Sequence, residues 1–296
     1  EIVRTISPDA IHYSDLEAFT DACATHKRDF ILPFVSGAVS RNRMCLVPAV
    51  CEAAGILYFG ADAYAKLLCQ NKPLSKLFAR RQGFATAPHR LLRTPEDADS
   101  VDTLEGPAVL KPAEEGCSIG VRLAPEGSAE RRRLARWMIA EYRQAIMAET
   151  FVPGREIVMA VTGPPDAPVW LGATELRHVS GPSYFNTNIY DADLKRDRMG
   201  SKPLHTVDVT DEIPSDVRAA ALRCYSRLGK LDYLRIDGRL TGTGFCFLEF
   251  SPIPYFGRAG ALETLLKRRG LDSNAFLAAL VALSRALQLG LKPPVI

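Results

Sequence analysis

Two acidic residues in the last quarter of the chain have the types and spacing to hold a metal ion. Residues 234–240 and 245–250 have the composition of β-strands, and the glycines of the Thr241-Gly242-Thr243-Gly244 segment between them can adopt the positive φ of a tight turn. The pattern predicts a β-hairpin. If the turn centres near Thr243, Asp237 lies directly opposite Glu249 on one face of the sheet.

Opposed carboxylates in such a hairpin have two interpretations. They repel each other unless a cation lies between them, and hard oxygen ligands of this kind suit Mg²⁺. Alternatively, one acid faces solvent and the other pairs with Arg235, which shares the face of Asp237. The hairpin alone leaves both interpretations open.

The first 70 residues predict a small α/β unit. Apolar runs at 29–35 and 56–60 flank a helical pattern at 44–54 that stops at Gly55. A strand, a helix and a second strand in this order favour an open parallel sheet. Because small α/β domains usually contain more strands, we expect that a first strand is missing.

Short strands dominate the central region, and the loop between two of them could bind phosphate. Helices are expected at 63–69 and 73–82, and strands at 90–92, 108–111 and 119–122. The loop 112–118 is small, polar and glycine-bearing, so its backbone N–H groups can hold phosphate oxygens. Glycine-containing hairpin loops are also common without this role.

The remaining segments predict an antiparallel sheet with helices. We expect strands at 156–162 and 169–176, and helices at 215–228, 262–267 and 273–289. Residues 179–202 are polar, charged and irregular, which is typical of functional loops or of disorder.

Composition excludes several classes of protein. The 296 residues carry a formal net charge of +3 with scattered basic residues, which argues against a nucleic-acid partner. No apolar stretch approaches the ~20 residues that span a bilayer, so we expect a soluble, cytoplasmic protein without a membrane partner. Seven cysteines without a CxxC pair predict reduced thiols. The chain starts at Glu1 rather than Met, which leaves a preceding or removed segment open.

The order of several motifs resembles the ATP-grasp superfamily, and within it the D-alanine–D-alanine ligases. The similarity runs from about residue 56 to the C-terminus. Its motifs are Asn71-Lys72-Pro73-Leu74-Ser75-Lys76, Val109-Leu110-Lys111-Pro112 with Glu115-Gly116-Cys117-Ser118-Ile119-Gly120-Val121, Glu149-Thr150-Phe151-Val152-Pro153-Gly154-Arg155-Glu156, and the hairpin.

The resemblance implies a fold of α/β and α+β class, an ATP-grasp fold preceded by a small open parallel-sheet domain. The expected units are 1–70, a central subdomain 71–148, and a C-terminal subdomain 149–296 that contains the metal hairpin. The implied activity is that of an ATP-dependent carboxylate–amine ligase, which forms an acyl phosphate that an amine then attacks. The implied cofactors are ATP and Mg²⁺, with Mn²⁺ as an alternative. The implied partner is an amino-acid-like small molecule, and a homodimer stays open.

The resemblance also assigns roles to single residues around the triphosphate. Lys72 and Lys111 would hold the α- and β-phosphates, and Lys195 of the mobile loop would close over the γ-phosphate. The phosphate-covering loop would contribute Glu115, Cys117 and Ser118.

Further roles follow for the nucleoside and the reacting group. Glu149 and the Val152 backbone would bind the amine edge of adenine with Phe151 nearby, and Glu156 would bind the ribose hydroxyls. Arg235 would stabilise the transferring phosphoryl group. Asp237, Glu249 and Ser251 would bind the metal.

Some positions depart from the pattern of the family. The metal strand of the family ends Glu-x-Asn, whereas Glu249 is followed here by Phe250 and Ser251, and a hydroxyl is a weaker Mg²⁺ ligand. Cys117 replaces the first loop serine, and Arg196 replaces a tyrosine of the mobile loop. Ser251 favours one alternative, a non-catalytic nucleotide-binding homologue. Another alternative, an ATP-independent α/β binding protein, does not explain the ordered motifs.

The amino-acid end of the site departs further. The His-Gly-x-x-Gly-Glu-Asp-Gly segment of the family is replaced at 36–43, and its Gly-Met-Thr-x-x-Ser-Leu turn is replaced at 255–261. We therefore expect a substrate other than D-alanine plus D-alanine, contacted by Arg258, Arg196 and Gly260.

Overall fold

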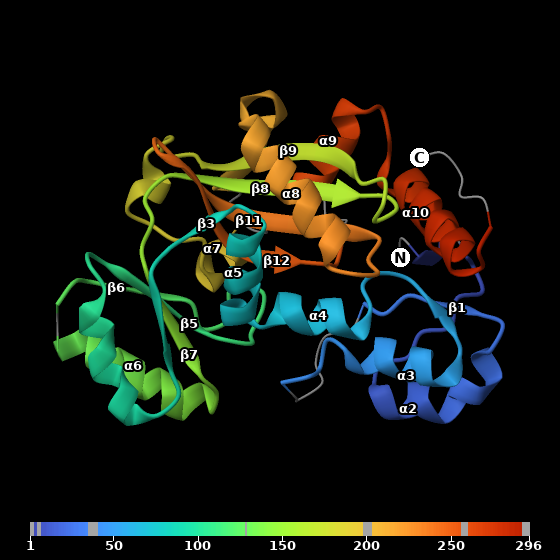
Figure 1. The fold of residues 1–296 in the computed structure, drawn as a ribbon, viewed down its shortest axis with the longest axis horizontal. Coiled ribbons are helices and arrows are strands. Elements are labelled where there is room, and N and C mark those ends of the chain that lie inside the picture. Colours follow the sequence, from blue (N-terminus) through green and yellow to red (C-terminus); the bar gives the residue numbers. More distant parts are fainter. Residues whose placement is uncertain are drawn as a thin grey trace.

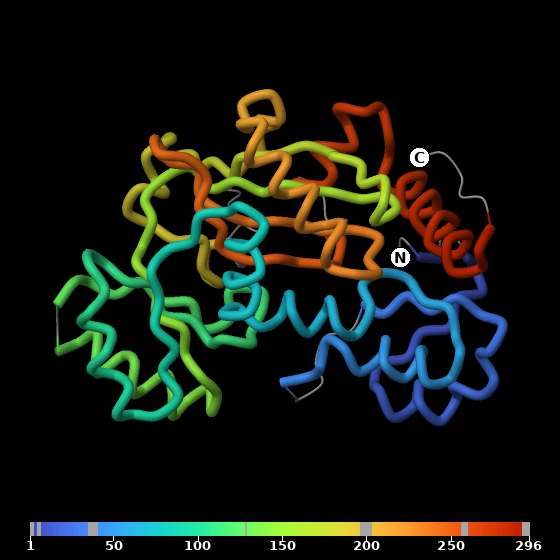
Figure 2. Tube along the Cα trace, viewed as in Figure 1, coloured from blue at the N-terminus to red at the C-terminus, as the bar shows by residue number. Residues whose placement is uncertain are grey.

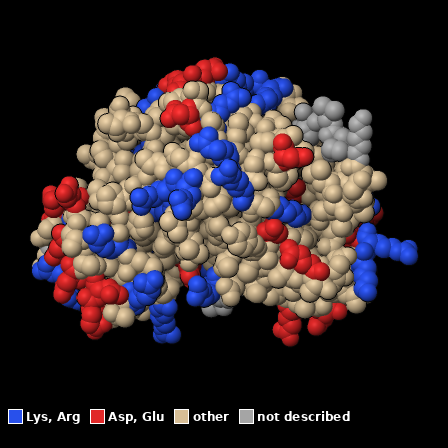
Figure 3. Space-filling model, in the orientation of Figure 1, with Lys and Arg blue, Asp and Glu red and all other residues tan. Residues whose placement is uncertain are grey.

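A computed structural model describes residues 3–4, 7–34, 41–127, 129–197, 203–255 and 260–291, without the side chains of residues 196 and 197. Figure 1 shows a large sheet with two smaller bodies below it, and Figure 2 shows that these bodies, formed by the N-terminal unit and by a four-stranded sheet, lie at opposite ends of the molecule. None of the described helices is long and apolar enough to cross a membrane. Lys and Arg side chains share the face drawn in Figure 3 with Asp and Glu.

The N-terminal unit contains the expected parallel strands. Its elements are α2 (Leu16–Ala22), η1 (Cys23–His26), β1 (Phe30–Ile31), α3 (Leu46–Ala54) and β2 (Leu57–Tyr58). Strands β1 and β2 pair in parallel, with Phe30 opposite Leu57, which confirms the predicted order of strand, helix and strand. Gly55 ends α3 at a φ of 67°, the left-handed conformation that glycine adopts most easily.

The central elements form a four-stranded sheet of order β4-β7-β5-β6. They are α4 (Ala63–Gln70), α5 (Lys72–Arg81), β3 (Ala85–Thr86), β4 (His89–Leu92), η2 (Pro95–Thr103), β5 (Ala108–Pro112), β6 (Arg122–Ala124), α6 (Ala129–Tyr142) and β7 (Ile146–Thr150). The strand expected at 119–122 begins only at Arg122, because Cys117 and Ser118 adopt positive φ and the Val121 N–H bonds back to the Ser118 carbonyl, which extends the loop.

The large sheet has the order β10-β9-β8-β11-β12-β3. The strands of this sheet after β3, and the helices that connect or follow them, are β8 (Arg155–Thr162), β9 (Val169–His178), η3 (Tyr184–Asn186), α7 (Ala192–Asp197), β10 (Leu204–Asp208), η4 (Thr210–Glu212), α8 (Ser215–Arg227), β11 (Tyr233–Thr241), β12 (Gly244–Ser251), α9 (Ala261–Arg268) and α10 (Ser273–Gln288). The predicted helices after residue 214 are confirmed. The predicted irregular segment 179–202 is described up to residue 197, and this part is less irregular than expected, because it contains η3 and α7.

Side chains of the large sheet alternate between two cores. One face packs on α4, α5 and α8 through residues that include Ala65, Ala79 and Cys224. The opposite face packs partly on α9 and α10, and the rest of that face is open. The proposed boundary between 1–70 and 71–148 falls between α4 and α5, which touch each other and both contact β12. The three-unit division stays a proposal.

A β-bulge sets the register of the hairpin. Thr241 pairs with Gly244, so the turn lies at Gly242 and Thr243 rather than being centred on Thr243. From this turn a regular ladder would place Leu248 opposite Asp237. The register shifts between Asp237 and Gly238, and this irregularity brings Glu249 opposite Asp237. The predicted opposition of the two acids is therefore confirmed, although a bulge produces it.

The bulge creates a close backbone approach that tolerates only glycine at 238. A Cβ there would lie 2.5 Å from the Cys246 carbonyl oxygen and closer still to the Phe245 ring. We expect Gly238→Ala to lower the free energy of unfolding by about 1–3 kcal/mol, as overpacking does. Urea denaturation measures this effect. The control is Gly242→Ala, where nothing lies within 4 Å, with an expected change within about 0.5 kcal/mol. Equal effects of both substitutions would contradict the bulge geometry.

Candidate active site

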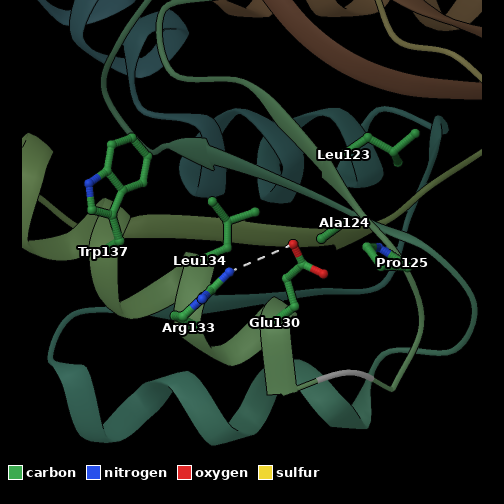
Figure 4. A pocket seen from close by; sticks show the side chains of 7 residues that line it. All are labelled: Leu123, Ala124, Pro125, Glu130, Arg133, Leu134 and Trp137. Atoms are coloured by element: carbon green, nitrogen blue, oxygen red, sulfur yellow. Dashed lines mark ion pairs between the residues drawn. The ribbon is translucent and has the colours of Figure 1, made fainter.

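A cleft of about 2110 Å³ lies between the open face of the large sheet and the four-stranded sheet. Its walls include the loop 113–121, the segment 189–195, and residues of the N-terminal unit. A smaller hollow of about 270 Å³ between β6 and α6 shares no lining residue with the cleft. Figure 4 shows Glu130, Arg133, Leu134 and Trp137 of α6 around it. The predicted chemical groups gather in the large cleft.

Glu149 on β7 forms the central ion-pair cluster of the cleft. Its two carboxylate oxygens pair with Lys76 of α5, at 2.6 Å, and with Lys111 of β5. The Lys76 ammonium also donates to the Phe247 carbonyl of β12, at 3.2 Å. Each of these three charged side chains is nearly inaccessible to solvent. The cluster therefore joins the four-stranded sheet to α5 and to the strand that carries Glu249.

Mutual attraction keeps this buried cluster charged. Burial raises the pKa of Glu149, but Lys111 and Lys76 outweigh it and lower the pKa to about 2. Burial lowers the pKa of Lys76. For Lys111 the attraction of Glu149 and Glu249 overcomes burial, so its pKa is raised. Lys111 therefore remains a fixed cation at the wall of the cleft.

Lys72 begins α5 beside the phosphate-covering loop. Its ammonium donates to the carbonyl oxygens of Pro112, at 3.1 Å, and Glu115. Burial lowers the pKa of Lys72 to about 8, against the attraction of Glu249. Glu249 thus acts on both Lys72 and Lys111, and both line the cleft. Their binding of phosphates stays a prediction.

The phosphate-covering loop is held from two sides. The Ser118 hydroxyl donates to the Tyr190 carbonyl, at 2.8 Å, which ties the loop to the segment before α7. The Glu115 carboxylate accepts from Arg43, at 2.9 Å, and from Gln144, at 3.0 Å. Cys117 is exposed at the tip of the loop. The nucleotide contacts of Glu115, Cys117 and Ser118 stay predictions.

The hinge between the two sheets offers free backbone groups. The Phe151 N–H donates to the Pro107 carbonyl, at 2.8 Å. Within the described residues the Val152 backbone forms no hydrogen bond, and Val152 lines the cleft. Glu149 also lines the cleft, but its oxygens are engaged by the lysines.

Arg239 is a buried hub beside this hinge that the sequence analysis missed. Its Nε lies 2.6 Å from Glu156, whose pKa burial raises against the pull of Arg239. It donates to the carbonyls of Gly154, at 3.0 Å, and Phe185, at 2.6 Å. Its alternation with Arg235 and Asp237 along β11 was the available signal that it faces the cleft.

At the hairpin both interpretations of the acids hold in part. The Arg235 guanidinium donates twice to Asp237, with both distances at 2.8 Å. Asp237 nevertheless faces Glu249, which has no hydrogen bond or ion pair within the described part of the chain. Ser251 lies opposite Arg235. The described residues contain no group of three or more His, Cys, Asp or Glu side chains that could hold a metal.

The two facing acids differ in proton affinity. Burial and then Glu249 raise the pKa of Asp237, although Arg235 opposes them. Burial also raises the pKa of Glu249, but the cations Lys72, Lys111 and Lys195 together lower it. Two carboxylates in one cleft with pKa values perturbed in opposite directions are candidates for a functional site.

Of the remaining predicted residues, two line the cleft and two fall wholly or partly outside the residues that the structure describes. Lys195 on α7 lines the cleft, with its ammonium 4.9 Å from the Tyr190 ring centre. Gly260 precedes α9 and lines the cleft. Arg258 and the side chain of Arg196 fall outside the described residues. Besides Arg239, the sequence analysis missed roles for Lys76, within a quoted motif, and for Arg43.

Comparisons with known proteins agree with this geometry. A family model described as D-ala D-ala ligase C-terminus matches residues 79–282. The chain is 29% identical to a D-alanine--D-alanine ligase of Chelativorans sp. (strain BNC1), over 79% of this chain and 74% of that protein.

Solved structures share the fold. One is D-alanine--D-alanine ligase from Bacillus anthracis complexed with ATP, with a TM-score of 0.69 and 21% identity over 92% of this chain and 84% of that one. Another is VanG D-Ala:D-Ser ligase from Enterococcus faecalis, with a TM-score of 0.67 and 20% identity over 86% of this chain and 73% of that one. The expected fold class is confirmed.

The cluster around Glu149 predicts a large stability effect. We expect Glu149→Gln to lower the free energy of unfolding by about 3–5 kcal/mol at pH 7, because it leaves Lys76 and Lys111 buried without their counter-charge. Because folding lowers the Glu149 pKa, the stabilisation is complete above its ordinary value of 4.5 and fades as the pH falls toward 2. Urea denaturation between pH 3 and 7 measures this effect. The difference in unfolding free energy between the wild type and Glu149→Gln should shrink as the pH falls.

The matched control is Glu141→Gln on the exposed face of α6. We expect it to change the unfolding free energy by less than about 0.5 kcal/mol. A Glu149→Gln protein as stable as this control would show that the cluster does not hold the two sheets together.

Proposed function

The chain belongs to the D-alanine–D-alanine ligase family and is an ATP-dependent ligase that forms a carbon–nitrogen bond, and we propose that it acts on an amino-acid-like substrate other than D-alanine plus D-alanine. The observation that supports the catalytic part is one cleft lined by Lys72, Lys111 and Lys195, whose charges lower the pKa of Glu249, a carboxylate without an ion pair among the described residues. Cations around a free acid suit a triphosphate and its metal ion.

We propose that the nucleoside lies at the hinge. The Val152 N–H and carbonyl can pair with the amine edge of adenine, because no other backbone group of the described chain occupies them. Glu156 can accept hydrogen bonds from the ribose hydroxyls while Arg239 fixes its position. The contact of Glu149 with adenine remains part of the proposal.

The lysines are proposed to bind the phosphates. Lys72 and Lys111 would meet the α- and β-phosphates, and binding would raise the depressed pKa of Lys72 by supplying an anion. Lys195 would meet the γ-phosphate from α7, with the Ser118–Tyr190 hydrogen bond holding the two covering segments together. Such a closure excludes water from the reacting groups.

Asp237 and Glu249 have the donor chemistry for Mg²⁺. They face each other from paired strands, and Glu249 has no competing partner among the described residues. Two carboxylates suffice because Mg²⁺ usually completes its octahedron with water and phosphate oxygens. When bound, the ion would neutralise phosphate charge during transfer. Ser251 would add at most a weak third ligand.

We propose that the reaction proceeds through an acyl phosphate. The substrate carboxylate attacks the γ-phosphorus and ADP leaves, and then the amine attacks the acyl carbon and expels phosphate to form the amide. Asp237 holds the Arg235 guanidinium by two hydrogen bonds, so that its remaining donors can stabilise the transferring oxygens. Arg235 therefore acts as a fixed positive charge. The proposed reaction needs no covalent bond between the protein and the substrate.

The proposed change of substrate rests on the chain's own residues. Segments 36–43 and 255–261 carry none of the polar pattern that the family places at its amino-acid end. We propose that Arg258, Arg196 and Gly260 contact the substrate there. D-Alanine plus D-alanine is the second candidate, because the curated relatives carry that name.

A screen of ADP formation separates the two candidates. With Mg²⁺ and ATP, we expect a panel of D- and L-amino acids to include a substrate whose kcat/KM exceeds that of D-alanine by at least about tenfold, or about 1.4 kcal/mol. The coupled release of ADP and of phosphate is the measurement. If D-alanine is the best substrate and D-alanyl-D-alanine is the product, the altered specificity is wrong.

The metal proposal is tested at Glu249, whose carboxylate has no hydrogen bond or ion pair within the described residues. We expect Glu249→Gln to lower ADP formation by at least about 100-fold, because the site loses a charged metal ligand. Without ligands the variant should unfold slightly more easily at pH 7, because the folded protein lowers the pKa of Glu249 and its charge offsets those of Lys72 and Lys111.

A second readout does not depend on turnover. ATP alone should raise the unfolding temperature of the wild type and of Glu249→Gln, whereas added Mg²⁺ should raise it further only in the wild type. Asp166→Asn, on an exposed turn, is the control for loss of one acid. An equal response of Glu249→Gln to Mg²⁺ would remove Glu249 from the metal site.

A further inference from the structure

A buried lysine without an acidic partner lies in the wall of the cleft. Lys66 on α4 is 2% exposed and is among the residues that line the cleft. Its ammonium donates one hydrogen bond, to the Pro33 carbonyl at 3.1 Å. An ammonium has three donors, and two of those of Lys66 have no partner within the described residues.

No carboxylate in the described part of the chain pairs with Lys66. The groups that act on its charge are Lys230, Cys51 and Cys45. Residues 35–40, which follow Pro33 in the sequence, contain no Asp or Glu. Unlike Lys72, whose charge Glu249, Glu115 and Glu149 favour, Lys66 has no carboxylate among the groups that act on it.

Two arginines that also line the cleft are paired with acids. Arg43 pairs with Glu115 at 2.9 Å, and Arg41 lies 3.5 Å from Glu114. An isolated buried ammonium is costly, which explains why burial, and then Lys230, lower the pKa of Lys66 to about 8. At that pKa the ammonium is still mostly charged at pH 7, so it can bind an anion.

The lysines assigned to the triphosphate form a separate group. The Lys72 ammonium donates to the carbonyls of Pro112 and Glu115 beside the phosphate-covering loop, whereas Lys66 donates to the Pro33 carbonyl of the N-terminal unit. The charge that acts most on Lys72 is Glu249, and the one that acts most on Lys66 is Lys230. We therefore assign the anion at Lys66 to a group other than the phosphates of ATP.

We propose that Lys66 binds a second acidic group of the substrate, a carboxylate in addition to the one that is activated. The substrate would then be a dicarboxylic amino acid or a molecule with an equivalent oxyanion. This inference rests on the proposed function for the presence of an amino-acid-like substrate in the cleft. It makes Lys66 a specificity-determining residue.

Calorimetric binding in the presence of Mg·ADP tests the site without turnover. The probes are aspartate, glutamate and 2-aminoadipate in both configurations, with D-alanine for comparison. We expect one dicarboxylic probe to bind the wild type at least tenfold more tightly than it binds Lys66→Met, as for a lost hydrogen bond to a charged group. D-Alanine should bind both proteins alike. Lys267→Met, on the exposed face of α9, controls for the loss of one positive charge.

Proton uptake separates recognition from a structural role. Because an anion raises the pKa of Lys66 from about 8, binding of the dicarboxylic probe at pH 8 should take up a fraction of a proton. Repeating the titration in buffers of different ionisation enthalpy measures this uptake. We expect uptake in the wild type and none in Lys66→Met. Lys66→Arg should bind the probe without uptake, since arginine stays charged.

Each outcome decides one claim. Equal affinity of wild type and Lys66→Met for every dicarboxylic probe overturns the anion site. Uptake that persists in Lys66→Met also overturns it, because another group then titrates. Selective loss of dicarboxylate binding without any ADP formation would support the anion site and refute the proposed function. ADP formation with D-alanine, without dicarboxylate binding, would refute only the anion site.

Discussion

The ion pairs between Glu149, Lys76 and Lys111 are the interaction on which the rest of the site depends. One carboxylate, buried at 2% exposure, holds a lysine of α5 and a lysine of β5, and Lys76 reaches on to the backbone of β12. Charges in a medium of low polarity are stable only while all of them are present. The cluster therefore fixes the distance between the four-stranded sheet and the hairpin, and with it the width of the cleft.

The hairpin adds a second constraint, which is a backbone irregularity rather than a charge. A regular ladder from the turn at Gly242 and Thr243 would oppose Asp237 with an apolar side chain, and the bulge replaces it with Glu249. Repulsion between the acids is offset on one side by Arg235 and on the other by the surrounding lysines. We propose these two acids as ligands for a divalent cation that accompanies the polyphosphate.

The sequence predicted the elements better than the contacts between them. Helix positions and the hairpin followed from periodicity and turn residues, and the opposition of the acids was predicted correctly from a turn placed half a residue too late. The alternation along β11 could have placed Arg239 on the face of the cleft, but its hydrogen-bond partners, like the burial of Lys66, come from other elements and could not be predicted. The segment 179–202 was expected to be irregular because it is polar, yet Asp191 caps the short helix α7 within it. A helix that is stabilised by such a cap and has no apolar face leaves no periodic pattern in the sequence, so it could not be predicted.

The central claim is that this cleft transfers the γ-phosphoryl group of ATP to a carboxylate. Isotope transfer tests it most directly: an amino acid that supports ADP formation is supplied with ¹⁸O in its carboxylate, and the released phosphate is analysed by mass spectrometry. The account predicts one ¹⁸O in each phosphate, because the carboxylate oxygen that attacks the γ-phosphorus leaves with it when the amine displaces phosphate. Phosphate without ¹⁸O would contradict an acyl phosphate, and with it the proposed roles of Arg235 and of the facing acids.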